Sequence, residues 1–228
     1  MSEKVSIIIV HHEEPEYLNI LLQSIKVCSI NNDYEIIIVD NDSNSNESLK
    51  YLEQIEIKEN ITIIRNARNE SYSKSLFSGL NGVSNDSEYL IFSHSDNVVL
   101  NKSWLDFLIG QEIDNQKFGA LCLGPLMDYT GPGRQMKQGP YYNFLFTKKS
   151  IFNNLNQFAA KEYNNVGLFL GYQLQLQEIG KETIMADPRG FMNHYACKKV
   201  SQEEKIADID KFNTFFVERM KKYNKAMK

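Results

Sequence analysis

The hydrophobic positions of this chain fall into short continuous runs that alternate with stretches of helical spacing. The runs are rich in β-branched residues, as in strands that are buried on both faces of a parallel sheet. Between them, apolar residues recur every three or four positions, as on one face of a helix. The pattern predicts strands at Val5–Val10, Glu35–Val39, Ile61–Ile64 and Tyr89–Ser93, and helices at Glu14–Cys28, Ser48–Ile55, Ser73–Val83 and Ser103–Ile109.

Strand and helix alternate up to about residue 110, whereas the second half of the chain is less regular. This alternation predicts right-handed β-α-β units, and therefore an α/β fold with a mainly parallel sheet flanked by helices. We expect residues 1–200 to form one domain, and residues 201–228 to form an amphipathic C-terminal helix packed on it or extending from it. Further predicted elements are strands at Phe118–Leu123, Tyr142–Thr147 and Glu182–Ala186, helices at Lys149–Phe152 and Gly167–Ile179, and a loop at Asp128–Gln138.

Polar side chains follow three of the predicted strands at the point where each strand ends. These clusters are His11-His12-Glu13, the segment from Asp40 to Asn44, and the segment from His94 to Asn97. In open parallel sheets, ligands bind outside the carboxyl ends of the strands. The three clusters are therefore expected to converge on one edge of the sheet and to form one ligand site.

Charge and cysteine content narrow the classes of function. The formal net charge of −4 provides no basic field to attract nucleic acid, so we expect no nucleic-acid partner. The three cysteines are scattered without a C-x-x-C pair, which indicates reduced thiols and not a zinc site. The first apolar run is too short for a secretory signal, and no stretch approaches the roughly 20 apolar residues that span a bilayer. We therefore expect a cytoplasmic protein, which can still meet the inner face of a membrane through a surface patch.

Several segments, in this order, resemble the family 2 glycosyltransferases of the GT-A fold. They are VSIIIVHHEEPEYLNILLQSI, EIIIVDNDSN, RNARNESYSKSLFSGL, YLIFSHSDNVVLNKSWL, FLFTKKSIF and IGKETIMADPRGFMNH, and together they span about residues 4 to 196. The resemblance implies a GT-A-like, Rossmann-like domain. It also implies transfer of a sugar from a nucleotide diphosphate sugar to an acceptor hydroxyl or amide, with inversion. A divalent ion, Mn²⁺ or Mg²⁺, would hold the diphosphate.

The resemblance also implies a metal site. Asp96 stands at the second acid of the family's D-x-D motif, and His194 stands where family members often carry a metal-ligating histidine. Mn²⁺ accepts both carboxylate oxygen and imidazole nitrogen, so both residues are implied as ligands. His94 replaces the first acid and, with Ser95, is implied to face the donor, either at a ribose hydroxyl or as a further ligand of Mn²⁺. Taken alone, His94 and Asp96 are equally consistent with ordinary turn residues.

The first two polar clusters are implied to contact the nucleotide. In the family, acids at the position of Asp40 recognise the imide N–H of uracil or thymine, with Asn41 or Asp42 beside it. The alternative is that these residues only cap a helix or close an Asx turn. His11 and His12 replace residues that normally touch the base. Successive strand residues point to opposite faces, so one histidine is expected to stack on the base and the other to be packed.

Phosphate contacts and the catalytic base carry the weakest signals. Arg68 and Lys74 could contact phosphate or base edges, or could belong to a solvated helix start. Arg134 lies in a glycine-containing stretch that reads either as a lid reaching the diphosphate or as a plain surface loop. An inverting transfer needs a carboxylate to take the acceptor proton. The usual acid pair is missing, so Glu162 is the first candidate for the base and Asp128 the second.

Two other functions stay open. The missing acid pair and His94 favour a catalytically degenerate module that binds a nucleotide sugar, or a synthase partner, without turnover. A nucleotidyltransferase would need a glycine-rich basic phosphate loop, and HHEEPE is the opposite. The acceptor is expected to be a glycan, a lipid-linked sugar or a protein. The basic end of the 201–228 segment could touch anionic lipid, or it could serve helix stability or contact between copies in a homo-oligomer.

Overall fold

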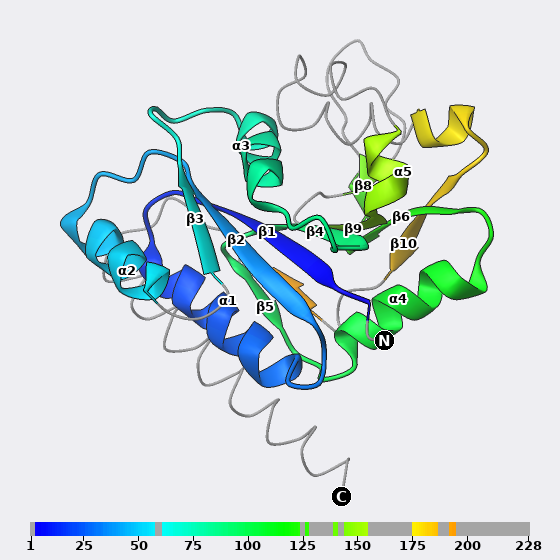
Figure 1. Ribbon diagram of the computed structural model, residues 1–228, viewed down its shortest axis with the longest axis horizontal. Coiled ribbons are helices and arrows are strands. Elements are labelled where there is room, and N and C mark those ends of the chain that lie inside the picture. The colour runs from blue at the N-terminus through cyan, green and yellow to red at the C-terminus, as the bar shows by residue number, and fades with distance from the viewer. Residues whose placement is uncertain are drawn as a thin grey trace, which may run out of the picture.

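A seven-stranded sheet is the centre of the computed structural model (Figure 1), and its strand order is β10-β6-β9-β4-β1-β2-β3. Among the strands of this sheet, β9 is antiparallel to both of its neighbours and the other pairings are parallel. The expected mainly parallel α/β sheet is therefore confirmed. The structure describes residues 3–57, 61–123, 126–127, 139–140, 144–154, 175–186 and 192–194.

The strands and helices follow the predicted order closely in the first half of the chain. The strands of the large sheet are β1 (Val5–His11), β2 (Tyr34–Asp40), β3 (Ile61–Arg65), β4 (Tyr89–His94), β6 (Phe118–Leu123), β9 (Phe144–Lys148) and β10 (Glu182–Ala186). The helices of the described part of the chain include α1 (Pro15–Cys28), α2 (Asn46–Glu56), α3 (Tyr72–Gly79), the short 3₁₀ helix η1 (Leu80–Gly82), α4 (Trp104–Asp114) and α5 (Lys149–Asn153).

The helices cover both faces of the sheet, because alternate residues of each strand point to opposite sides. On one face, Ile7 and Ile9 of β1 pack in a cluster with apolar residues of α1, α2 and α4. On the other, Ile8 and Val10 pack with residues of α3 and α5. Figure 1 shows the two helix layers below and above the sheet. Burial on both faces explains why the central strands are continuous runs of Ile and Val.

Two short sheets lie outside this framework and were not predicted. β5 (Asn97–Val99) pairs antiparallel with β11 (Met192–His194), and β7 (Leu126–Met127) pairs with β8 (Gly139–Pro140). Strands of two or three residues carry no periodic signal, so pattern alone could not find them. β5 packs on α1, where Ser24 Oγ accepts a hydrogen bond from the Val99 backbone N–H at 3.0 Å.

Other differences concern element boundaries. The predicted strand Tyr142–Thr147 is β9, shifted two residues at its start, and the predicted helix Ser73–Val83 is divided into α3 and η1. The loop Asp128–Gln138 and the 201–228 segment lie outside the described residues, as does most of Gly167–Ile179. No helix in the described part of the chain is long and apolar enough to cross a membrane.

Candidate functional site

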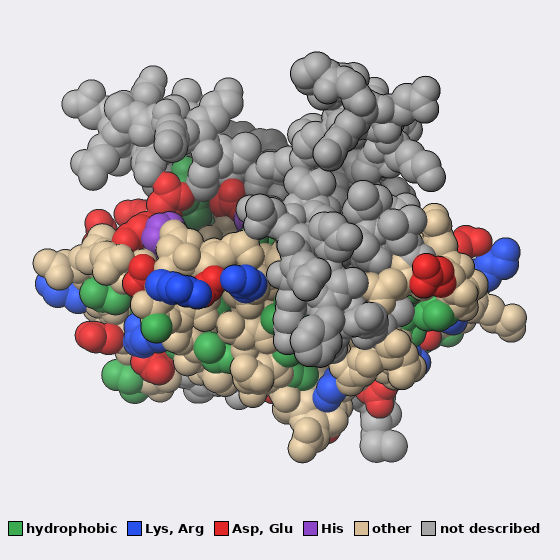
Figure 2. All heavy atoms as spheres, turned by 90° about the horizontal axis from the view of Figure 1, so that it is seen from above, with side chains coloured by type: hydrophobic (Ala, Val, Ile, Leu, Met, Phe, Trp, Pro, Cys, Tyr) green, Lys and Arg blue, Asp and Glu red, His purple; other side chains and the backbone are tan. Residues whose placement is uncertain are grey.

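The carboxyl ends of four neighbouring parallel strands, β4, β1, β2 and β3, lie in register at one edge of the sheet. His11 at the end of β1 is opposite Asp40 of β2, and Asp40 is opposite Arg65 of β3. On the other side of β1, Val10 is opposite His94 of β4. This register brings the three polar clusters to the same edge of the sheet, as the sequence predicted. On the face seen in Figure 2, histidine and acidic side chains gather together.

Asp40 is buried within this edge, with 3% of its surface exposed. Its Oδ1 accepts a hydrogen bond from the Ser43 backbone N–H at 3.0 Å, and its Oδ2 lies 3.6 Å from the Arg65 guanidinium. The first contact is a local bond between side chain and backbone that holds the turn after β2, so it serves the structural role that was left open for Asp40. Arg65 was not anticipated, although its place at the end of β3 follows from the same strand-end rule.

Asn41 uses its whole side chain within the protein. Its Oδ1 accepts hydrogen bonds from Asn66 Nδ2 at 2.9 Å, the Glu70 backbone N–H at 2.9 Å and Ser75 Oγ at 2.8 Å. Its Nδ2 donates to Asn69 Oδ1 at 3.0 Å and to the Glu70 carbonyl at 2.9 Å. Asn41 therefore ties the end of β2 to the segment after β3 and to α3.

Three acidic residues at this edge have backbone conformations that usually require glycine. Their φ angles are 54° at Glu13, 53° at Glu14 and 67° at Asp42. Non-glycine residues in this region store strain and cluster at functional sites. The strain is offset by side-chain contacts: Asp42 Oδ2 accepts from the Asn69 N–H at 3.1 Å, and the Glu13 carboxylate accepts from the Ser45 N–H at 3.2 Å.

The adjacent histidines at the end of β1, His11 and His12, have different surroundings. His11 is fully buried, with Nε2 3.0 Å from Ser48 Oγ, and burial lowers its pKa to about 4. It is therefore neutral at pH 7, and it is the packed member of the pair. His12 is exposed, with Nδ1 3.0 Å from the Asn41 carbonyl and Nε2 3.3 Å from Asn69 Nδ2. Of the two, His12 is the one that a ligand at this edge can reach.

The two predicted phosphate contacts share one carboxylate. Arg68 Nε donates to Glu70 Oε1 at 2.6 Å, and Lys74 Nζ donates to Glu70 Oε2 at 3.3 Å. The hydrogen bond from Arg68 has the largest effect on the pKa of Glu70, and together with the bond from Lys74 it lowers that pKa. Both cations are largely exposed, so the pairs are weak and can exchange Glu70 for another anion. Their spacing along the chain did not reveal Glu70 as their common partner.

The turn after β4 is held by an aromatic contact. The His94 ring stacks on the Tyr72 ring with centroids 3.9 Å apart and planes inclined by 26°. Ser95 and Asp96 form the turn between β4 and β5, and both are half-buried, as is His94. Burial first, and then the Asp96 carboxylate, raise the pKa of the Tyr72 hydroxyl well above its usual range. Tyr72 was missed in the sequence because it lies at a helix start and carries no motif.

The short strands bring the chain at His194 next to the turn that carries Asp96. In the antiparallel pair of β5 and β11, His194 is opposite Asn97, the residue next to Asp96. A carboxylate and an imidazole are residue types that suit Mn²⁺, with the remaining positions left for oxygens of a ligand. Among the side chains that the structure describes, no group of three His, Cys, Asp or Glu could hold a metal alone.

Three predicted site residues lie outside the described residues. They are Asp128 and Glu162, the candidates for the catalytic base, and Arg134, the candidate for the lid.

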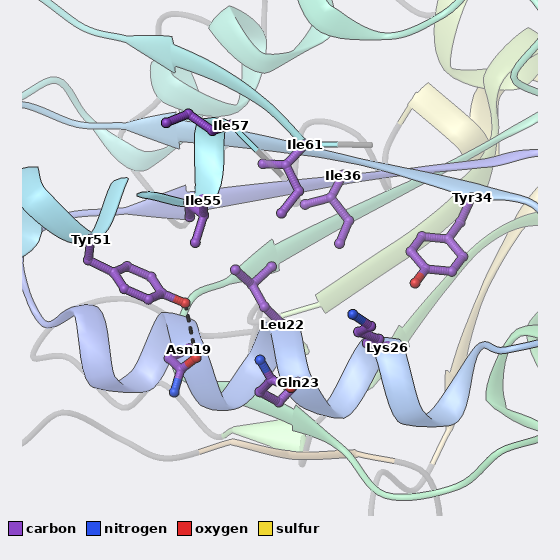
Figure 3. Close-up of a pocket in the computed structure, with 10 residues that line it drawn as sticks. All are labelled: Asn19, Leu22, Gln23, Lys26, Tyr34, Ile36, Tyr51, Ile55, Ile57 and Ile61. Carbon is purple, nitrogen blue, oxygen red and sulfur yellow. Dashed lines mark hydrogen bonds between the residues drawn. The ribbon is translucent and has the colours of Figure 1, made fainter. Parts of the chain in front are cut away.

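A separate hollow of about 470 Å³ lies between α1, α2 and the start of β2 and β3 (Figure 3). Ile36 and Ile61, which pair across the two strands, form part of its floor. Lys26 is its one charged side chain. Asp40 lies four residues further along β2, or roughly 13 Å at the rise of a strand. This hollow is therefore distinct from the strand-end site. Its lining is Asn19, Leu22, Gln23, Lys26, Tyr34, Ile36, Tyr51, Ile55, Ile57 and Ile61.

Comparisons with known proteins agree with this geometry. The family model described as glycosyl transferase family 2 matches residues 6–178. The mannosyltransferase PcManGT from Pyrobaculum calidifontis, in complex with GDP-Man and Mn²⁺, superposes with a TM-score of 0.61 at 10% sequence identity. It aligns with 82% of this chain, over 55% of its own chain. Residues 1–349 of TarS from S. aureus, in complex with UDP-GlcNAc, superpose with a TM-score of 0.57 at 16% identity. The match covers 87% of this chain and 60% of TarS 1–349.

The superposed framework is extensive, so these likenesses establish a GT-A fold. Because the identities are low, they establish the fold alone. The chain spans little more than half the length of the solved chains that it matches. No curated protein sequence matches it.

Proposed function

The chain belongs to glycosyl transferase family 2, and on that premise we propose that it moves a sugar from a nucleotide diphosphate sugar to an acceptor, with inversion and with the help of a divalent metal ion. The donor is a UDP- or dTDP-sugar, and the acceptor is a glycan, a lipid-linked sugar or a protein. The solved chains with the same fold carry GDP-Man with Mn²⁺ in one case and UDP-GlcNAc in the other.

The pairing of β5 with β11 is the observation that supports this function most directly. It sets His194 opposite Asn97, one residue from Asp96, at the carboxyl edge where the central strands end. A charged diphosphate needs compensation in a region that already carries Glu13, Asp42 and Asp96. A divalent ion between Asp96, His194 and the diphosphate would supply it.

Each side chain at the edge then has a defined task. When bound, Mn²⁺ or Mg²⁺ neutralises the charge that develops on the departing diphosphate. Asp96 and His194 would hold the metal ion and, through it, the diphosphate at the sheet edge, and His94, held by Tyr72, faces the ribose together with Ser95. Asp40, Asn41 and Asp42 shape the pocket for the base, and His12 lies at its open side.

The reaction itself needs two further contributions. Arg68, Lys74 and Arg134 would bind the diphosphate, with Arg68 and Lys74 leaving Glu70 as the donor arrives. A carboxylate must take the acceptor proton as the acceptor oxygen attacks the anomeric carbon from the side opposite the diphosphate. Glu162 is our first candidate for this base and Asp128 the second. We place the reaction in the cytoplasm, with the 201–228 segment as a possible contact to the inner membrane face or to a second copy of the chain.

Donor hydrolysis tests the proposal without knowledge of the acceptor. UDP-, dTDP- and GDP-sugars are incubated with the protein in Mn²⁺ or in EDTA, and the released nucleoside diphosphate is measured. We expect release from one class of donor, only with metal, and its loss in Asp96→Asn. Asp33→Asn is the matched control, because Asp33 is an exposed acid before the start of β2. Tight binding of a donor without release or transfer would instead support the degenerate module.

A further inference from the structure

His12, Asn41 and Asn69 form a closed ring of hydrogen bonds at the carboxyl edge. The ring has three links: Asn41 Nδ2 to Asn69 Oδ1 at 3.0 Å, Asn69 Nδ2 to His12 Nε2 at 3.3 Å, and His12 Nδ1 to the Asn41 carbonyl at 3.0 Å. The three residues follow three different strands, β1, β2 and β3. The ring therefore joins the three strand ends.

The backbone of Glu70 fixes the orientation of the two side-chain amides in this ring. Its N–H can only donate and lies 2.9 Å from Asn41 Oδ1, and its carbonyl can only accept and lies 2.9 Å from Asn41 Nδ2. The Asn41 amide therefore cannot be reversed. Because Asn41 Nδ2 donates to Asn69 Oδ1, the Asn69 amide is fixed as well, and its Nδ2 must face His12 as a donor.

The two ends of the ring then define the protonation of His12. The Asn41 carbonyl is an acceptor, so His12 Nδ1 carries a hydrogen and donates it. Asn69 Nδ2 is a donor, so His12 Nε2 presents its lone pair and accepts. Only the neutral Nδ1–H tautomer satisfies both partners, because the position of the proton on an imidazole is set by these bonds.

We propose that Asn41 and Asn69 are positioning residues that lock His12 as the neutral Nδ1–H tautomer, so that its exposed ring offers its face to the planar base of the donor. That one of the two histidines stacks on the base is what the family resemblance implies and rests on the proposed function, and the hydrogen bonds add the positioning by Asn41 and Asn69. Both ring nitrogens are occupied in the plane of the imidazole, so the face is what remains for a ligand. Stacking on a flat face tolerates different bases, so His12 contributes affinity and leaves base selection to other groups.

The tautomer is measured first, by nitrogen NMR of the full chain labelled in its histidines. The chain has four histidines, so the spectrum is simple, and the His12 signals are those missing from His12→Phe. We expect the Nδ1 shift of a protonated nitrogen and the Nε2 shift of an unprotonated one. The reverse pattern would contradict the assigned hydrogen bonds of His12. In Asn69→Ala, the Nε2 signal should move towards that of a water-exposed imidazole.

Nucleotide affinity is measured next, by calorimetry with UDP, dTDP and GDP in the presence of Mn²⁺. His12→Ala should bind the preferred nucleotide roughly ten- to a hundredfold more weakly, whereas His12→Phe, which keeps a flat face, should stay within about threefold of the native protein. Asn69→Ala should lose about three- to tenfold, since the ring remains but is no longer held in place. Thermal melts of each variant confirm that it is folded.

The outcomes separate the two parts of the inference. Equal binding by His12→Ala and the native chain overturns the stacking role, as does His12→Phe binding as weakly as His12→Ala. If the native chain binds no nucleotide, the proposed function fails and the stacking role fails with it. The tautomer of His12 still tests the hydrogen-bond ring in that case, because it is measured without ligand.

Discussion

The imidazole ring of His94 stacks on the phenol ring of Tyr72, with centroids 3.9 Å apart. Tyr72 is the first residue of α3 and His94 the last of β4, so the contact joins two segments that are far apart in the sequence. A buried aromatic residue therefore supports the last residue of β4, just before the turn. The turn that carries Asp96 begins directly after it.

Loss of this stack should loosen the turn. Tyr72→Leu removes the aromatic face and should lower the free energy of unfolding by about 1–2 kcal/mol. It should also weaken nucleotide binding, because His94 and the turn lose their support. Urea unfolding and calorimetry measure both effects. Tyr72→Phe keeps the ring and serves as the control. If the Leu variant matches the native protein in both measurements, the stack has no positioning role.

The buried His11 should make stability depend on pH. Burial lowers its folded pKa to about 4, against the ordinary value of 6.5 in the unfolded chain. The folded state resists protonation, so the stability is fully present above pH 6.5 and is lost as the pH falls towards about 4. The pKa difference corresponds to roughly 3 kcal/mol. We expect the free energy of unfolding to decline across this range.

His11→Gln isolates the contribution of His11 from that of other groups. Carboxylates with lowered pKa values, such as Glu13 and Glu35, also destabilise the fold in acid, but they are common to both proteins. The decline between pH 6.5 and 4 should therefore be smaller in the variant by roughly 3 kcal/mol. Parallel pH profiles for the two proteins would show that His11 titrates normally in the folded state.

The framework of the fold could be predicted because both of its signals are local. The apolar run Val5–Val10 reflects a strand that is buried on both faces, and the helical spacing in Glu14–Cys28 reflects a helix that is buried on one face. Neither signal depends on residues that are distant in the sequence. β5 and β11 could not be predicted in this way. They are three-residue strands whose pairing depends on residues about 95 positions apart in the chain.

The candidate site was predicted at the level of strand ends but not of contacts. The rule that parallel strands end at one edge correctly brought Asp40, His94 and the end of β1 at His11 together. Which histidine is packed depends on Ser48 of α2, and no sequence pattern reports such a partner. The sequence also could not predict that every hydrogen-bonding group of the Asn41 side chain has a partner, since those partners come from two later segments.

The amide of Asn41 should not tolerate replacement by the isosteric acid. In Asn41→Asp, one carboxylate oxygen would face the Glu70 carbonyl, where Nδ2 now donates at 2.9 Å. We expect a loss of about 1–3 kcal/mol in the free energy of unfolding at pH 7. Asn101→Asp is the matched control, because Asn101 Oδ1 accepts from the Ser103 N–H and an acid keeps that contact. Equal stability of the two variants would contradict the assigned orientation of Asn41.

The close approach of α3 to the sheet should make Gly79 intolerant of a side chain. A Cβ at this position would overlap Ile8 Cγ2 and lie 3.0 Å from Val39 Cγ2. Gly79→Ala should therefore destabilise the protein by about 1–3 kcal/mol in urea unfolding. Gly110→Ala, in α4, meets nothing within 4 Å and should stabilise by about 0.5–1 kcal/mol. A neutral Gly79→Ala would mean that the helix can move away from the sheet.

Metal-dependent nucleotide binding tests the account most directly. The melting temperature is measured with UDP, dTDP, GDP and CMP, each with and without Mn²⁺, for the native chain, Asp96→Ala and the control Asp33→Ala. At about 100 times its dissociation constant, a ligand stabilises by roughly 2.7 kcal/mol, which is readily visible. We predict that one nucleoside diphosphate stabilises the native chain and Asp33→Ala only with Mn²⁺, and that Asp96→Ala abolishes the effect. Absence of any nucleotide shift in the native chain, or an undiminished shift in Asp96→Ala, would contradict a metal-assisted donor site at this edge.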